Sequence, residues 1–211
     1  YCVGPSDRQL SGNAARQLAC PSSGSPAAFV AEHPGLFDVT GFAHHPYSFD
    51  EAPNRVANPN IITLAELPRF ESVLNQIFAD YGKAATGGVP LYLTEFGYKT
   101  NPPNPFVKTS LAEQATWLNQ GEYMTWQMPY VRALAQFLLT DEPPRTSQPK
   151  NSSAYWGTFQ TGLIMRTGSI KPGYYAFRVP VWVPQPSHGS HVTIWGQLRP
   201  ANHAGVQYAV L

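Results

Sequence analysis

Short apolar segments alternate with amphipathic segments along this chain, and this alternation restricts the fold more than any other feature of the sequence. The apolar segments at 36–43, 89–94 and 134–140 have the length of β-strands. The segments at 68–81 and 110–126 lie between them and have the periodicity or the start signals of helices. Strands that alternate with helices pair in parallel and place the helices against the sheet. The sequence therefore predicts an α/β fold.

The two expected helices differ in how clearly they are marked. The first follows a possible capping box formed by Thr63 and Glu66, and it ends at Gly82. The second opens with the same pattern at Ser110 and Glu113. The first has one apolar stripe with helical spacing, made by Phe70, Val73, Leu74, Ile77, Phe78 and Tyr81. We expect a main helix from about Pro68 and a second helix through about Trp126, followed later by a short helical turn around 174–177.

The segment 89–94 has no alternation of polar and apolar residues, which is typical of a strand buried on both faces. The tail differs, because 191–198 and 206–210 do alternate, with a turn-like segment between them. We therefore predict a β-hairpin there, as the beginning of a small accessory β domain over 181–211. Residues 1–180 form the other unit.

Composition excludes several classes of protein. The chain has 211 residues, 43% of them hydrophobic and 13% charged, and a net charge of +1. Nucleic-acid binding requires a concentrated positive field, which this sequence lacks. No apolar run approaches the ~20 residues that a membrane span needs. We expect no nucleic-acid partner and no membrane partner.

The two cysteines, Cys2 and Cys20, permit two readings. A disulfide between them would contribute roughly 3 kcal/mol by chain entropy, whereas two buried free thiols are an equally open alternative. The loops are rich in Ser, Thr, Asn and Pro, and Asn151 begins a glycosylation sequon. These features favour a secreted protein. The sequence starts without Met and without a signal segment, so we expect processing or truncation before Tyr1.

Glu95 is the leading candidate for chemistry, because it closes the apolar strand at 91–94. Burial penalises the charged form of a carboxylate, so a carboxylate at this place needs a reason. In a parallel α/β barrel the carboxyl ends of the strands form the catalytic face. The alternative is a structural ion pair with a neighbouring Arg or Lys.

Three further residues close strands at the same expected edge. His45 and Tyr47 are two apart and therefore share a face, so the Tyr47 hydroxyl could donate to a carboxylate on the adjacent strand and His45 to a sugar hydroxyl. His44 should point the other way. Asp141 closes the third strand, where substrate binding and loop capping are both open. A packing Tyr and a satisfied core histidine remain alternatives for the first pair.

Other arrangements of chemically active residues are absent from the sequence. It has no Gly-x-Ser-x-Gly motif and no phosphate-binding glycine loop. His188 and His191 lack the partners of a metal site, so we expect no metal and no cofactor. Trp156, in the loop after the third strand, is the candidate platform for stacking a sugar.

Several motifs together resemble a known group. They are His44-His45-Pro46-Tyr47, Leu93-Thr94-Glu95-Phe96-Gly97-Tyr98, Leu138-Leu139-Thr140-Asp141-Glu142, Thr161-Gly162-Leu163, Lys171-Pro172-Gly173-Tyr174-Tyr175-Ala176-Phe177-Arg178 and Val192-Thr193-Ile194-Trp195-Gly196-Gln197-Leu198-Arg199-Pro200. The first three are similar to strands six, seven and eight of the large clan of retaining (β/α)₈ glycoside hydrolases, which includes cellulases, β-xylosidases and arabinofuranosidases. The last three resemble the ending of secreted actinobacterial members.

The resemblance implies the C-terminal half of a (β/α)₈ TIM barrel, strands five to eight, followed by the start of a small β-sandwich-like domain. It also implies that Glu95 is the nucleophile of a retaining O-glycoside hydrolase, that Tyr47 hydrogen-bonds it and that residues 1–5 are the remnant of strand five. The substrate would be a carbohydrate. The acid/base of this clan follows an Asn, and no Asn-Glu pair occurs in this chain.

A retaining hydrolase needs two carboxyl groups, so the second would come from outside this chain. We therefore expect this segment alone to be inactive, and to be accompanied by the N-terminal half of the barrel or by another copy. Phe42 and Leu93 would be uncovered if they point inward. The alternatives are a non-catalytic carbohydrate-binding or interaction protein built on a partial barrel, and a structural remnant without function.

Overall fold

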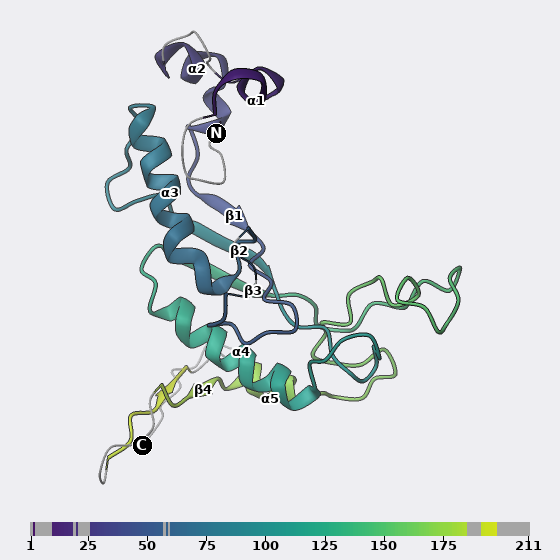
Figure 1. Ribbon diagram of the computed structural model, residues 1–211. Coiled ribbons are helices and arrows are strands. Elements are labelled where there is room, and N and C mark those ends of the chain that lie inside the picture. The colour runs from purple at the N-terminus through teal and green to yellow at the C-terminus, as the bar shows by residue number, and fades with distance from the viewer. Residues whose placement is uncertain are drawn as a thin grey trace.

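A computed structural model describes residues 2, 10–18, 20, 26–56, 58, 60–184 and 191–197 (Figure 1). The described elements, in chain order, are α1 (Gly12–Gln17), α2 (Pro26–Glu32), the 3₁₀ turn η1 (Pro34–Leu36), β1 (Phe42–His44), the 3₁₀ turn η2 (Leu64–Glu66), α3 (Leu67–Asp80), β2 (Leu91–Phe96), α4 (Leu111–Trp126), β3 (Val131–Gln136), α5 (Pro172–Arg178), β4 (Val181–Trp182) and β5 (Trp195–Gly196). None of these helices is long and apolar enough to cross a membrane.

The centre of the fold is a three-stranded parallel sheet in the order β1-β2-β3. Helix α3 connects β1 to β2 and helix α4 connects β2 to β3, and both lie to one side of the strands (Figure 1). The predicted α/β class is therefore confirmed in the form of a mixed α/β unit with a parallel sheet.

The face of β2 that meets the helices is fully buried. Leu91 and Leu93 have no exposed surface. Phe96 lies beyond an irregularity in the register of β2 with β3, and it packs close to Gly121 of α4. The apolar stripe of α3 covers the same side, with Leu74, Ile77 and Phe78 in the common core. Burial of such side chains contributes about 1.5–3 kcal/mol each, so this layer stabilises the unit.

The other face of the sheet is open, which corrects the expectation that β2 is buried on both faces. Tyr92 is 38% exposed and Thr94 is exposed as well. Leu93, expected at an uncovered face, is fully buried against the helices, and Phe42 is partly buried. Because side chains alternate along a strand, a continuous apolar run does not show which face has a cover. The described helices cover only one face of the sheet.

The two capping boxes have different outcomes. Ser110 Oγ accepts from the Glu113 backbone N at 3.1 Å, and Glu113 Oε2 accepts from the Ser110 backbone N at 2.8 Å. At Thr63 no side-chain cap bond forms, because η2 intervenes before α3 begins at Leu67. The first predicted capping box is therefore wrong, whereas the second is confirmed.

Strand boundaries also differ from those expected. In the segment 36–43 only Phe42 and Ala43 belong to a strand, β1, which continues to His44. Phe37 instead packs its ring against Phe78 and Tyr81. The third strand begins and ends earlier than 134–140, since pairing with β2 aligns Val131 with Leu91 at one end. The partner strand determines these limits, and local composition does not.

The C-terminal part described here makes a two-stranded antiparallel sheet of β4 and β5. Trp195 is buried there against the rings of Tyr123 and Trp126 on α4. The predicted second strand of the hairpin, 206–210, lies outside the described residues. Of the expected strand-five remnant, only Cys2 is described, and it is not in a strand.

Cys2 and Cys20 form a disulfide, with their Cα atoms 5.6 Å apart. The backbone N of Leu10 donates to the Cys2 carbonyl within the closed loop, and both cysteines belong to the buried core cluster. The open alternative of two free thiols is therefore not what the structure contains.

We expect the Cys2–Cys20 bridge to form in protein produced under oxidising conditions, and its reduction to cost about 3 kcal/mol of local stability through loop entropy. Intact mass before and after reduction and alkylation would show the bridge as two added alkyl groups. Cys2→Ser/Cys20→Ser protein is the matched control, because reductant should leave its melting curve unchanged. Two free thiols in the oxidised sample would contradict the assignment.

Candidate active site

The loops that follow β1, β2 and β3 lie at one edge of the sheet, the carboxyl edge of all its strands (Figure 1). Glu95 lies there, one residue before the end of β2, and its side chain is 27% exposed. Gly97 follows and allows a close approach to the loop after β3, since a Cβ there would lie 2.5 Å from the Phe137 carbonyl oxygen. The backbone just after Glu95 is thus packed against the loop after β3, while the Glu95 side chain stays partly exposed.

Tyr47 orients this carboxylate. Its hydroxyl donates to Glu95 Oε2 at 2.9 Å, as the sequence predicts for two residues on adjacent parallel strands. Burial raises the pKa of Tyr47, and the hydrogen bond to Glu95 raises this pKa further. Tyr47 therefore stays protonated and remains a donor across the range of pH in which proteins work.

His45 also approaches this carboxylate oxygen. Its Nδ1 lies 3.5 Å from Glu95 Oε2, and its Nε2 lies 3.0 Å from Thr94 Oγ1. His44 points the opposite way, as expected, and its Nε2 donates to the Ile62 carbonyl at 2.8 Å. Burial lowers the pKa of His44, so this ring is neutral and structural.

The two contacts leave the Glu95 carboxylate asymmetric. Oε2 takes both Tyr47 and His45, whereas no hydrogen bond reaches Oε1 from the part of the chain that the structure describes. A partly exposed carboxylate with one oxygen hydrogen-bonded and the other without a hydrogen bond can act as a nucleophile, as a base or as an acceptor for a hydroxyl group.

Asp141 corrects the sequence prediction of a substrate-binding residue. It is 2% exposed, and its Oδ1 accepts from Lys171 Nζ at 2.7 Å and from the Gly162 backbone N at 2.8 Å. Burial raises the pKa of Asp141 and lowers that of Lys171, while each partner opposes the shift of the other. Asp141 is thus one half of a buried structural ion pair, and a substrate cannot reach it.

Trp156 also lies away from the cavity beside Tyr47. It is partly buried, its ring packs edge-on against Tyr155, and its indole Nε1 has no hydrogen-bond partner among the described residues. The aromatic residue of this loop that does reach the cavity is Phe159. The predicted stacking role of Trp156 therefore has no support in the geometry.

The cavity next to Tyr47 has a volume of about 410 Å³. Sequence reasoning missed most of its lining, because the loops that build it have no periodicity that would indicate orientation. An aromatic residue in the same loop as Trp156 was the one available signal for Phe159. The lining residues are Tyr47, Phe49, Asp50, Gly97, Lys99, Val107, Phe159 and Thr161.

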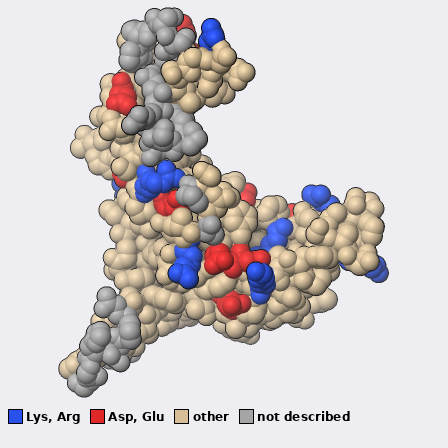
Figure 2. Space-filling view, viewed as in Figure 1, with Lys and Arg blue, Asp and Glu red and all other residues tan. Residues whose placement is uncertain are grey.

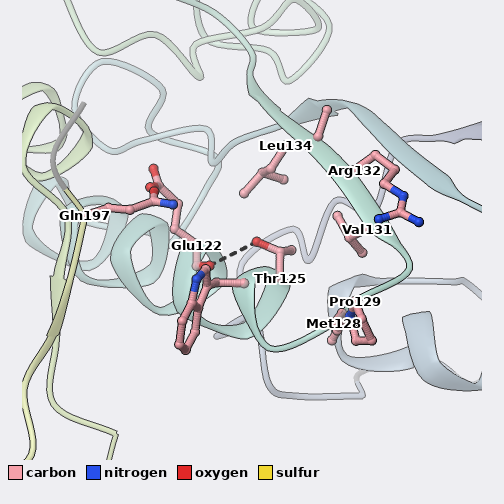
Figure 3. A pocket seen from close by; sticks show the side chains of 10 residues that line it. Glu122, Thr125, Met128, Pro129, Val131, Arg132, Leu134 and Gln197 are labelled. Atoms are coloured by element: carbon pink, nitrogen blue, oxygen red, sulfur yellow. Dashed lines mark hydrogen bonds between the residues drawn. The ribbon is translucent and has the colours of Figure 1, made fainter. Parts of the chain in front are cut away.

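A second cavity, of about 380 Å³, lies between α4 and the amino-terminal part of β3 (Figure 3). Glu122 and Thr125 of α4 face it from one side, and Val131, Arg132 and Leu134 of β3 lie on the other. It is therefore at the opposite end of the strands from Glu95, and it takes no part in the site at the carboxyl edge. Across the described ranges, no cluster of His, Cys, Asp and Glu is able to hold a metal ion.

No family model and no curated protein matches this sequence. Solved structures that resemble the chain include a family 39 glycoside hydrolase from the gut symbiont Bacteroides cellulosilyticus WH2, at 18% identity and a TM-score of 0.46, covering 72% of this chain and 29% of that one. Another is the β-glucuronidase of Ruminococcus gnavus, at 15% identity and a TM-score of 0.39, covering 65% of this chain and 21% of that one. The β-glucuronidase of Lactobacillus rhamnosus has 16% identity and a TM-score of 0.38, and the match covers 66% of this chain and 22% of that one.

These neighbours are glycoside hydrolases. The chain spans less than a third of the length of each of them. Similarity of this degree carries no argument about a reaction or a substrate.

Proposed function

We propose that this chain is part of a retaining O-glycoside hydrolase in which Glu95 is the nucleophile. The observation that carries the proposal is the asymmetric carboxylate at the carboxyl edge of a parallel sheet. Tyr47 holds Oε2 at 2.9 Å and Oε1 is left for an incoming substrate. The resemblance of the motifs around His45, Tyr47 and Glu95 to the retaining clan supports the same assignment.

In the proposed reaction Glu95 Oε1 attacks the anomeric carbon and forms a glycosyl ester, while a second carboxyl group protonates the departing oxygen. Water then attacks the ester, that second group takes its proton, and Glu95 leaves as a carboxylate. Tyr47 fixes Oε2 through both steps. Among the described residues, no carboxyl group contacts Glu95 through a hydrogen bond or an ion pair, and we place the acid/base outside this chain.

Covalent trapping tests the role of Glu95. The full-length protein that contains this chain is incubated with 2-deoxy-2-fluoro aryl glycosides of glucose, xylose and arabinose, whose glycosyl esters hydrolyse slowly. We expect one added sugar mass per protein, mapped by peptide mass spectrometry to the peptide containing Glu95. Labelling of another carboxylate, or turnover of these probes without any labelled peptide, would refute the assignment.

A non-catalytic carbohydrate-binding protein is the second candidate, and one observation favours it. In the described residues, the polar partners of Glu95 are Tyr47 and His45 and no second carboxyl group contacts it, whereas retaining hydrolysis needs two carboxyl groups that act together. Saturable sugar binding by the full-length protein, without release of any aglycone over days, would favour this candidate.

We further propose that the parallel sheet represents strands six to eight of a (β/α)₈ barrel, and that the protein works outside the cell, where the Cys2–Cys20 disulfide persists. Strands β1 and β3 are edge strands of the described sheet, and the face that carries Tyr92 and Thr94 is exposed. An edge strand has unpaired backbone N–H and C=O groups that can pair with further strands. The rest of the barrel, or another copy of this chain, would cover that side.

The open edges lead to a prediction for the 211-residue segment produced alone. We expect it to associate with itself or to be recovered with the remainder of the barrel, and to show no turnover of aryl glycosides. Light scattering coupled to gel filtration measures the first property, and a chromogenic assay measures the second. A cooperatively melting monomer with measurable turnover would overturn both expectations, whereas co-expression with the remainder of the barrel should give a discrete particle.

A further inference from the structure

The cavity beside Tyr47 has an aromatic wall. Tyr47, which holds Glu95, contributes one side, and the ring of Phe159 lies 6.2 Å from its ring at an interplanar angle of 32°. Phe159 itself is supported from behind by Phe137, whose ring meets it edge-on at 5.2 Å. The cavity therefore has a flat apolar surface, and one of its residues, Tyr47, also hydrogen-bonds Glu95.

Phe49 adds a second aromatic side chain under unusual backbone conditions. Its φ of 55° lies in the left-handed region, which a bulky residue seldom adopts because it is strained there. Its side chain is 62% exposed, although its neighbour Ser48 is buried. The strained backbone therefore does not bury Phe49 in the core. It leaves the Phe49 ring exposed, where it lines the cavity. Such strain concentrates at ligand-binding sites.

The polar rim of the cavity consists of Asp50 and Lys99. Asp50 Oδ1 accepts from Thr109 Oγ1 at 3.0 Å, and Lys99 Nζ lies 5.2 Å from the centre of the Phe159 ring. Burial lowers the pKa of Lys99, whereas Glu142 and Asp50 raise this pKa and Arg145 lowers it. The lysine is thus surrounded by charges of both signs.

This balance of charge bears on what the cavity can bind. Two carboxylates and one further cation act on Lys99, so the rim has no net positive field for an anionic ligand. The space-filling view shows the same mixture, with acidic and basic side chains next to each other over the loops that follow β1 and β2 (Figure 2). A neutral ligand with several hydroxyl groups fits donors and acceptors of this kind.

We infer that this cavity is a subsite for an uncharged pyranose ring beside Tyr47, the residue that hydrogen-bonds Glu95. The C–H face of the ring would stack on Phe159 and Phe49, and its hydroxyl groups would bond to Asp50 and Lys99. The volume of about 410 Å³ accommodates a monosaccharide, and apolar walls with a few polar groups are typical of small-molecule sites. This inference rests on the proposed function and names the class of sugar that the site takes.

The test uses the full-length Glu95→Gln protein, in which bound glycosides are not consumed. Methyl β-D-glucopyranoside, methyl β-D-xylopyranoside and methyl β-D-glucuronide are titrated, and saturation-transfer NMR reports the bound protons. We expect at least one neutral glycoside to bind more tightly than the glucuronide, with transfer strongest to the C–H protons of one ring face. Phe159→Ala should weaken binding about tenfold. Phe159→Leu should also weaken binding, because it keeps an apolar side chain of similar size but removes the flat ring.

Tyr175→Ala, which removes an exposed aromatic residue of α5, is the matched control and should leave the binding constant unchanged. Preferred binding of the glucuronide, no binding of either neutral probe, or unchanged binding in both Phe159 variants would overturn the subsite. Failure of the proposed function reads out differently. Full turnover by Glu95→Gln would refute the role of Glu95 as nucleophile without bearing on the subsite. Trapping of a sugar at Glu95 together with an unchanged KM in Phe159→Leu would refute the subsite alone.

Discussion

Replacing Glu95 with glutamine is expected to reduce kcat of the full-length protein at least about 10³-fold, because the amide cannot form the glycosyl ester. The amide oxygen can still accept from the Tyr47 hydroxyl, so the loops around the site should keep their positions. Release of p-nitrophenol from aryl glycosides measures kcat, and binding of a methyl glycoside measures whether the site remains intact. Turnover should vanish while binding persists.

Glu32→Gln is the matched control for this substitution, since Glu32 is an exposed residue of α2 and should give wild-type kinetics. A second variant, Glu95→Gly, separates a nucleophile from a residue that only positions others. Azide added to it can enter the space of the carboxylate and attack the anomeric carbon, which yields a glycosyl azide of inverted configuration. Retained activity of Glu95→Gln, or Glu95→Gly protein that azide does not rescue, would exclude the nucleophilic role.

Replacing Lys171 with methionine is expected to destabilise the protein by about 3–5 kcal/mol, because it leaves the charge of Asp141 buried without its cation. Lys171 is fully buried and donates to Asp141 Oδ1, to Thr100 Oγ1 and to the Gln160 carbonyl. The Gly162 backbone N would then be the one remaining donor seen on Asp141 in the described ranges. The free energy of unfolding from urea titration measures the loss.

The exposed Lys150 provides the matched control, and Lys150→Met should change the unfolding free energy by less than about 0.5 kcal/mol. The double variant Asp141→Leu/Lys171→Met leaves no buried charge at this place, so we expect it to be more stable than Lys171→Met alone. A loss below about 1 kcal/mol in Lys171→Met would show that the pair does not stabilise the fold.

The buried ion pair also concerns function. Its hydrogen bonds join the loop after β3, through Gln160 and Asp141, to the loop after β2, through Thr100. Phe159 of the cavity wall directly precedes Gln160, and its backbone N donates to Glu142 Oε2 at 2.9 Å. The buried pair of Asp141 and Lys171 therefore connects the two loops by hydrogen bonds.

Much of the local structure was determined by the sequence alone. The capping box at Ser110 and Glu113 and the apolar stripe of α3 depend on residues three to eight apart in the chain, so local patterns specify them. The pairing of Tyr47 with Glu95 was also predictable, because two residues that close adjacent parallel strands on one face must meet. The disulfide remained one of two open readings until the cysteines were seen bonded.

What only the tertiary structure decided depends on neighbours that are distant in the chain. Asp141 was a candidate for substrate binding until Lys171, thirty positions away, appeared on its carboxylate. Phe159 replaced Trp156 in the cavity because aperiodic loops leave side-chain direction unspecified. The open face of β2 was hidden for the same reason. Periodicity reports which residues share a face, whereas burial and access depend on what the rest of the fold places against that face.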